Sequence, residues 1–194
     1  SMMNPGGGKV ALAHDHSAMA GVSNQESSNQ PSMPSEDMSK QVDTEFREQL
    51  KEVYEAYILM KNAFVASDAT EIQSRVKVVG SALQDVDMEL LAGESHMKWM
   101  QFLETLKSEL SSISGTLDLP NQRKAFSIFN DAFYKAVITF GLPGDTVYYQ
   151  YCPMANGDKG AYWFSNIKEI ENPYFGDEML RCGETREVLD FIEK

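Results

Sequence analysis

Apolar residues recur every three or four positions along the middle of the chain, which is the spacing of one helix face. The pattern occurs four times, over Val42 to Phe64, Ile72 to Leu90, Trp99 to Ile113 and Phe126 to Phe140. Asp68 and Glu71 resemble a capping box before the second series, and Pro120 suits the first turn of the fourth. The second, third and fourth helices are each predicted to end at a glycine, namely Gly93, Gly115 and Gly141. Four helices joined by short loops most simply form an up-down-up-down bundle over residues 41–141.

Helical periodicity stops near Pro143. The region 142–194 has a different pattern of residue types, in which glycine and proline separate short segments. Its first segment, Thr146 to Tyr151, is rich in β-branched and aromatic residues and is predicted to pair with Tyr162 to Phe164 as a short β-hairpin across a turn at 156–160. Glu184 to Ile192 is predicted to be a final short helix. We therefore expect a mainly α protein, in which a small irregular α/β appendage packs against one end of the four-helix bundle.

Residues 1–40 have a composition typical of a disordered tail or linker. They combine glycine, serine, asparagine, glutamine and proline with almost no aromatic residues. The start at Ser1 followed by two methionines is typical of an expression remnant, so a natural targeting segment is expected to be missing there. His14 and His16 could bind Cu(II) in this tail, although two histidines beside such a remnant are more often incidental.

Composition and charge narrow the possible partners. Hydrophobic residues make up 42% of the chain and charged residues 24%, so wholesale disorder is excluded. Seventeen Lys and Arg against 29 Asp and Glu give a formal net charge of −12, which repels phosphate backbones and anionic lipid. Nucleic acid and membrane surfaces are therefore not expected as partners. No apolar stretch approaches the roughly 18 residues that a membrane span needs.

The candidate chemistry lies in two sulfur pairs of mirrored order. Cys152 precedes Met154, and Met179 precedes Cys182. Thiolates and thioethers are soft ligands that select Cu(I), or Ag(I) by the same logic. Zinc fits less well, because a structural zinc site uses four Cys or His ligands and this region has two cysteines and no histidine. The spacing alone leaves open a Cys152–Cys182 disulfide with the methionines as core filler, and also a pair of inert buried thiols.

Other chemistry has less support in the sequence. His96 and Met100 are four residues apart at the start of the third predicted helix, so with Met97 they could extend a sulfur site. A histidine at the rim of the bundle is the simpler interpretation. The sequence has no Gly-x-Ser-x-Gly motif, no phosphate-binding loop and no histidine after His96 to act as a base for Cys152. We therefore do not expect an enzyme.

The sulfur-bearing region also resembles a known family. Its motifs are Tyr149 to Ala155, Lys159 to Ser165, Ile170 to Gly176 and Met179 to Gly183. Together with the helices, over about residues 41–190, they resemble a bacterial domain family of unknown function that occurs in secreted or lipid-anchored proteins. They are similar also to the terminal extension of some copper and silver efflux adaptor (membrane-fusion) subunits. The resemblance implies a periplasmic or lipoprotein-anchored extracytoplasmic location and a role in heavy-metal handling.

Two hypotheses of different classes follow. In the first, the protein binds Cu(I) or Ag(I) as an accessory to efflux or copper handling, and an efflux adaptor or another periplasmic protein is its partner. The metal ligands would be Cys152, Met154, Met179 and Cys182. In the second, the protein is an interaction module without metal, stapled by a structural Cys152–Cys182 disulfide. The two can coexist, because reduction of a disulfide would release the thiols for Cu(I).

Overall fold

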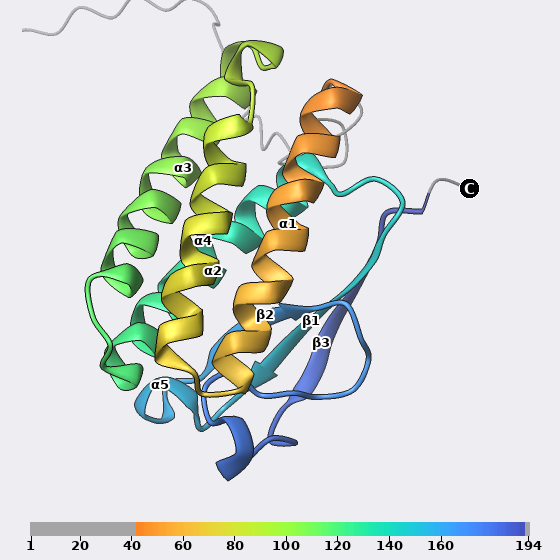
Figure 1. Ribbon diagram of the computed structural model, residues 1–194. Helices are drawn as coiled ribbons and strands as arrows, with labels where there is room; N and C mark the ends of the chain where they lie inside the picture. The colour runs from red at the N-terminus through yellow and green to blue at the C-terminus, as the bar shows by residue number, and fades with distance from the viewer. Residues whose placement is uncertain (1–41, 193–194) are drawn as a thin grey trace, which may run out of the picture. The chain divides into compact units, whose positions relative to one another are not determined.

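The computed structural model describes residues 42–192. Four long helices come first and a small antiparallel sheet follows, so the protein is mainly α as predicted (Figure 1). The elements are α1 (Thr44–Val65), α2 (Ala69–Asp85), η2 (Met88–Leu90), α3 (Gly93–Ser114), α4 (Leu119–Phe140), β1 (Thr146–Cys152), α5 (Ala155–Asp158), β2 (Ala161–Ser165), η3 (Gly176–Glu178) and β3 (Glu184–Asp190). The predicted tail over residues 1–40 lies outside the described residues. None of the helices within 42–192 combines the length and hydrophobicity needed to cross a membrane.

The helices alternate in direction and pack as a bundle, which confirms the prediction from periodicity (Figure 1). Three of them begin at an aspartate whose side chain accepts a backbone N–H of the first turn: Asp43, Asp68 and Asp118. The predicted ends at Gly115 and Gly141 are confirmed. Aromatic rings fill the interior, and near one end Phe46 meets Trp99 and Phe140 edge to face at centroid distances of 5.2 and 5.0 Å.

The prediction that the second helix extends to Gly93 is wrong. Helix α2 ends at Asp85, and Gly93 opens α3 instead of closing α2. The apolar series continues beyond the helix because Val86 and Leu91 are buried from the connection itself. Asp87 shapes that connection, since its side chain accepts the Glu89 N–H at 2.9 Å and caps the short η2 turn.

The predicted hairpin is present, and a third strand joins it. Strand β1 pairs antiparallel with β2, with Tyr148 opposite Ser165 and Cys152 opposite Ala161. Strand β3 pairs with the other edge of β1, giving the order β2-β1-β3. The predicted helix over 184–192 is therefore wrong. Residues that favour helices in isolation form a strand here, because β1 offers an unpaired edge for backbone hydrogen bonds.

The sheet packs against the side of the bundle, not against its end as predicted. Phe164 of β2 contacts Tyr57 of α1 and Phe133 of α4, at centroid distances of 6.1 and 5.6 Å. Contact with the end of a helix is found around Gly176, where an added Cβ would lie 2.7 Å from the carbonyl oxygen of Val65 at the end of α1. A sheet with an aromatic face buries more apolar area along the flank of two helices than at their ends.

A buried hydrogen-bond network ties the sheet to the helices. The Tyr57 hydroxyl accepts the Phe164 N–H at 2.9 Å and donates to Asn130 Oδ1 at 2.5 Å. Asn130 Nδ2 in turn lies 3.1 Å from the hydroxyl of Tyr174, which donates to the carbonyl of Tyr162. Helices α1 and α4, strand β2 and the Tyr174 segment are thus held in one arrangement.

Lys61 is a charged residue in the interior, and replacing it with methionine is expected to stabilise the fold. Its side chain is 1% exposed, and Nζ lies 3.9 Å from Glu171 Oε2. Burial lowers the pKa of Lys61, and the negative charge of Glu171 opposes this effect. Lys61→Met keeps the apolar packing and removes the buried charge, so the free energy of unfolding in urea at neutral pH should rise by about 1 kcal/mol.

The sign of the pH dependence provides a check on this prediction. A lowered lysine pKa penalises the folded state only while the amine is protonated, so the gain should shrink as the pH rises towards the ordinary lysine value of 10.5. Glu171→Gln serves as the control and should lower stability, because it leaves the buried Lys61 charge without its partner. A Lys61→Met protein less stable than wild type would contradict the prediction.

Candidate functional site

The sheet brings the two cysteines of the chain together. Cys152 ends β1 and Cys182 lies two residues before β3, and their sulfur atoms are 3.2 Å apart although 30 residues separate them in sequence. The register explains this contact, because Tyr151 next to Cys152 pairs with Glu184. Both are free thiols; Cys152 is fully buried and Cys182 is partly exposed.

The spacing of the two sulfur atoms suits both kinds of sulfur chemistry. A disulfide bond is about 2.05 Å long. Two thiolates on one ion, with metal–sulfur bonds of about 2.3 Å as for zinc, lie at most about 4.6 Å apart. The observed 3.2 Å falls between these values, so a small side-chain movement leads to either state.

The Cys182 thiol does not have the lowered pKa of an activated nucleophile. The hydrogen bond with Cys152 raises the pKa of Cys182, and burial and the Cys152 charge act in the same direction. A catalytic cysteine has the opposite property, a lowered pKa beside a cation or base. At Cys182 the raised pKa favours the protonated thiol, and a metal ion that binds the sulfur must displace this proton.

A buried asparagine holds the segment that carries Cys182. Asn172 Nδ2 donates to the Cys182 carbonyl at 2.8 Å, and its Oδ1 accepts the Tyr174 N–H at 2.8 Å. The Asn172 backbone N–H also donates to the Leu180 carbonyl at 2.9 Å. We did not identify Asn172 as a site residue from the sequence; its only signal was its place in the turn before Pro173.

Gly183, next to Cys182, is required by a close approach of two backbones. Its φ is +137°, and a Cβ at this position would lie 2.8 Å from the Tyr151 carbonyl oxygen and 3.0 Å from the Trp163 ring. A larger residue would therefore push the Cys182 segment away from β1. The Trp163 ring thus lies beside Gly183, the residue that follows Cys182.

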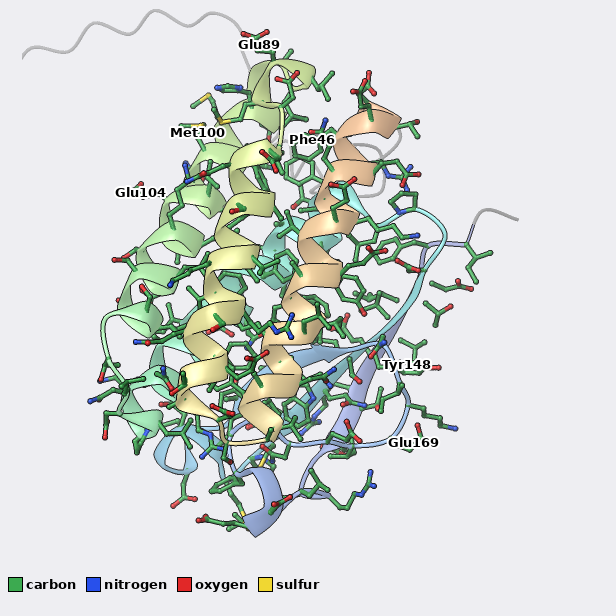
Figure 2. All side chains as sticks on the ribbon, in the orientation of Figure 1. Phe46, Glu89, Met100, Glu104, Tyr148 and Glu169 are labelled. Atoms are coloured by element: carbon green, nitrogen blue, oxygen red, sulfur yellow. The ribbon has the colours of Figure 1, made fainter. Side chains whose placement is uncertain are left out.

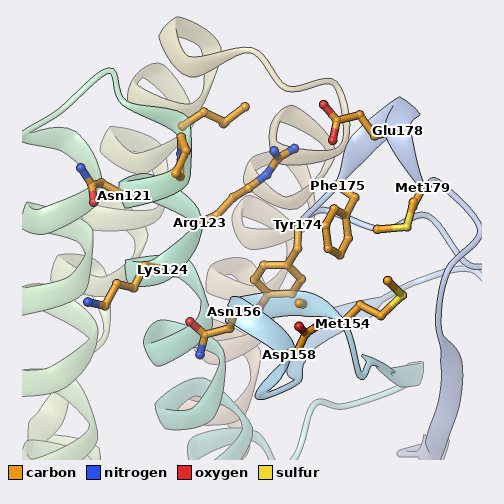
Figure 3. Close-up of a pocket in the computed structure, with 14 residues that line it drawn as sticks. Asn121, Arg123, Lys124, Met154, Asn156, Asp158, Tyr174, Phe175, Glu178 and Met179 are labelled. Atoms are coloured by element: carbon orange, nitrogen blue, oxygen red, sulfur yellow. The ribbon is translucent and has the colours of Figure 1, made fainter.

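The two methionines of the predicted site line a cavity instead of joining the thiols. Met154 and Met179 lie side by side at one edge of a cavity of about 810 Å³, next to Phe175 (Figure 3). Met154 is 47% exposed. Among the described residues that line this cavity, neither Cys152 nor Cys182 is present. The structure thus arranges the four predicted ligands as a thiol pair and a thioether pair.

Arg123 is one of the charged residues that line this cavity, and its guanidinium donates hydrogen bonds to neighbouring backbone carbonyls. Arg123 donates to the carbonyls of Pro173 and Phe64 at 2.9 and 3.2 Å and to Ser67 Oγ at 2.9 Å. Burial lowers the pKa of Arg123, whereas the charge of Glu178 opposes this effect. With its donors used in this way, Arg123 fixes the turn that carries Tyr174 against the bundle.

Within residues 42–192, the one histidine, His96, does not extend the thiol site. His96 lies at the start of α3, at the end of the bundle opposite to the end of β1 (Figure 1). His14 and His16 lie outside the described residues. Over 42–192, no three His, Cys, Asp or Glu side chains are grouped so as to hold a metal ion. Among the described residues, no imidazole or carboxylate is thus grouped with Cys152 and Cys182 around a shared metal position.

Comparison with known proteins gives a family match, and it lies in the helical part of the chain. Residues 53–144 match a family described as "Protein of unknown function (DUF3347)". The match covers most of α1, all of α2, α3 and α4, and ends just before β1. Searches among curated proteins and among solved structures gave no match. The motifs that carry the sulfur residues lie after the matched stretch, so their resemblance to efflux adaptor extensions remains a prediction.

Proposed function

We propose that this protein binds Cu(I), or Ag(I), through the thiolates of Cys152 and Cys182, and that the thioethers of Met154 and Met179 assist at the neighbouring cavity. The observation that carries the proposal is the meeting of the two thiols at 3.2 Å across the sheet. Two soft sulfur ligands held side by side at one end of the β1–β3 ladder suit a d¹⁰ ion and no hard cation.

Access and surroundings support metal binding over a purely structural bond. Cys182 is partly exposed, which gives an ion a route to the buried Cys152. Two further soft donors, Met154 and Met179, are available from the same part of the fold. A permanent disulfide would not explain why Met154 is 47% exposed. Capture of Cu(I) would explain it, because a thioether at the surface can bind the ion first.

The role we propose is accessory to heavy-metal efflux or copper handling outside the cytoplasm. This part of the proposal depends on the resemblance of the 149–183 motifs to extensions of efflux adaptor subunits. The net charge of −12 is compatible with it, since an acidic surface does not repel a cation. An adaptor subunit or another periplasmic protein would be the partner that supplies or receives the ion.

An anaerobic Cu(I) titration against a chromophoric chelator tests the proposal. The fully reduced protein should bind one Cu(I) ion tightly. Protein with an oxidised Cys152–Cys182 disulfide should not bind this ion. Replacing both Met154 and Met179 with leucine should weaken this binding by about tenfold, because thioethers are neutral and individually weak ligands. Equal uptake by the reduced and oxidised forms would exclude a thiol site.

The disulfide-stapled interaction module is the second candidate, because the 3.2 Å sulfur separation also suits bond formation. Alkylation of non-reduced native protein followed by mass spectrometry distinguishes the two. A permanent staple leaves no thiol to alkylate, whereas two alkylated cysteines contradict it. If both cysteines are alkylated, the strands keep their register without a covalent link between Cys152 and Cys182.

A further inference from the structure

We infer that His96, Met97 and Met100 form a second, weaker site for soft monovalent metal at the start of α3. This site is independent of the thiol pair, since it lies at the opposite end of the bundle (Figure 1). Helix α3 has 22 residues and is therefore about 33 Å long, so no single ion is shared between the two sites.

The three side chains share one sector of the helix surface. At about 100° per residue, Met100 projects between His96 and Met97, and all three fall within an arc of about 100°. Met97 is 65% exposed and Met100 is 43% exposed. Figure 2 places Met100 and Glu104 along the same outer side of α3, and Glu104 adds a negative charge one turn away. Flexible methionine side chains in this position can close on one ion with the imidazole.

The histidine has the hydrogen bond that a metal ligand uses. His96 Nδ1 lies 3.3 Å from the carbonyl oxygen of Met88. Because a carbonyl only accepts, Nδ1 carries the hydrogen, and the neutral ring then presents the lone pair of Nε2. A backbone carbonyl on the other ring nitrogen is the usual second partner of a metal-bound histidine.

Packing does not explain the two methionines. The buried stripe of α3 consists of Trp99, Leu103, Leu106, Leu110 and Ile113. Met97 and Met100 lie off that stripe, so their thioethers face solvent where a polar residue would serve the fold equally well. One imidazole nitrogen and two thioether sulfurs form a neutral, soft ligand set that favours Cu(I) and Ag(I) over Zn²⁺.

The test uses Ag(I), which is diamagnetic, and full-length protein with ¹³C-labelled methionine methyl groups. Cys152→Ser with Cys182→Ser removes the thiol site, and disulfide-oxidised wild type replaces this variant if it does not fold. Saturable shifts of the Met97 and Met100 methyl resonances are expected, with Met60, which is fully buried, unchanged. His96→Gln should weaken the binding at least about tenfold, because one of three ligands is lost.

The outcomes separate this site from the thiol site. Met154→Leu is the matched control and should leave the Met97 and Met100 shifts unchanged. Shifts confined to methionines before residue 42, or undiminished in His96→Gln, would overturn the three-ligand site. The absence of any shift at Met97 and Met100 would do the same and leave them as an apolar surface patch. The sample used in this test has no free thiol, so its result does not affect the proposed thiol site. The Cu(I) titration of the thiol site likewise leaves the His96 site untouched.

Discussion

Replacing Cys182 with serine is expected to weaken Cu(I) binding by at least about 1000-fold, equivalent to about 4 kcal/mol. A serine hydroxyl is a hard, neutral ligand and leaves Cu(I) with a single thiolate, Cys152. The β-ladder cannot bring another soft anionic group to that position, because the rest of the described chain contains no cysteine. Competition with a high-affinity chromophoric chelator under anaerobic conditions measures the change.

Controls for this experiment follow from burial. Cys182 is partly exposed, so serine there creates little strain, whereas Cys152 is fully buried and a hydroxyl in its place lowers stability. Cys152→Ala avoids the buried hydroxyl and should lose Cu(I) binding to a similar extent. Thermal unfolding of each variant confirms that the fold remains. A Cys182→Ser protein with wild-type affinity would refute the thiol site and shift attention to the interaction-module hypothesis.

The bundle was predictable because each helix has a recognisable pattern of residues within its own stretch of sequence. An apolar residue every three or four positions marks the buried face, and residues such as Asp68 and Pro120 mark the starts. The end of α2 was not predictable in this way. Val86 and Leu91 continue the apolar series from a non-helical connection, and periodicity does not distinguish a buried loop residue from a buried helix residue.

Strand β3 was not predicted because its conformation depends on pairing with β1, which lies far away in the sequence. Only two of its residues, Thr185 and Leu189, are partly buried, so the alternation that marks a strand is absent. Its hydrogen bonds come from β1, more than thirty residues earlier in the chain. Non-local pairing of this kind overrides the helix preference of glutamate, arginine and leucine, and local sequence carries no sign of it.

The candidate site was predictable in part. The mirrored order of cysteine and methionine indicated that Cys152 and Cys182 act together, and the structure does bring their sulfur atoms into contact. The same pattern did not show that Met154 and Met179 belong to a separate cavity wall. Sequence spacing gives the types of ligand, but which of them converge depends on strand register and on turns such as the one held by Asn172.

The affinity for Cu(I) is expected to rise with pH, by up to about 100-fold per pH unit below the thiol range, because each thiol that binds as thiolate gives up one proton. The pKa of Cys182 is raised above its ordinary value of 9.0, so this thiol is protonated at neutral pH and the ion must displace its proton. The sign is therefore fixed: acid weakens binding, and the dependence persists beyond pH 9.0 instead of levelling off below it. Competition titrations between about pH 6 and 8, corrected for protonation of the chelator, measure the slope.

Proton release provides an independent check on the same prediction. In weakly buffered solution, Cu(I) uptake by reduced protein should release protons, and Cys182→Ser should reduce the number by one. Binding at His96, Met97 and Met100 differs in kind, because thioethers carry no proton and the imidazole gives up at most one. An affinity that stays flat across this pH range would mean that the bound ion has no thiolate ligand. The contact between Cys152 and Cys182 would then be structural.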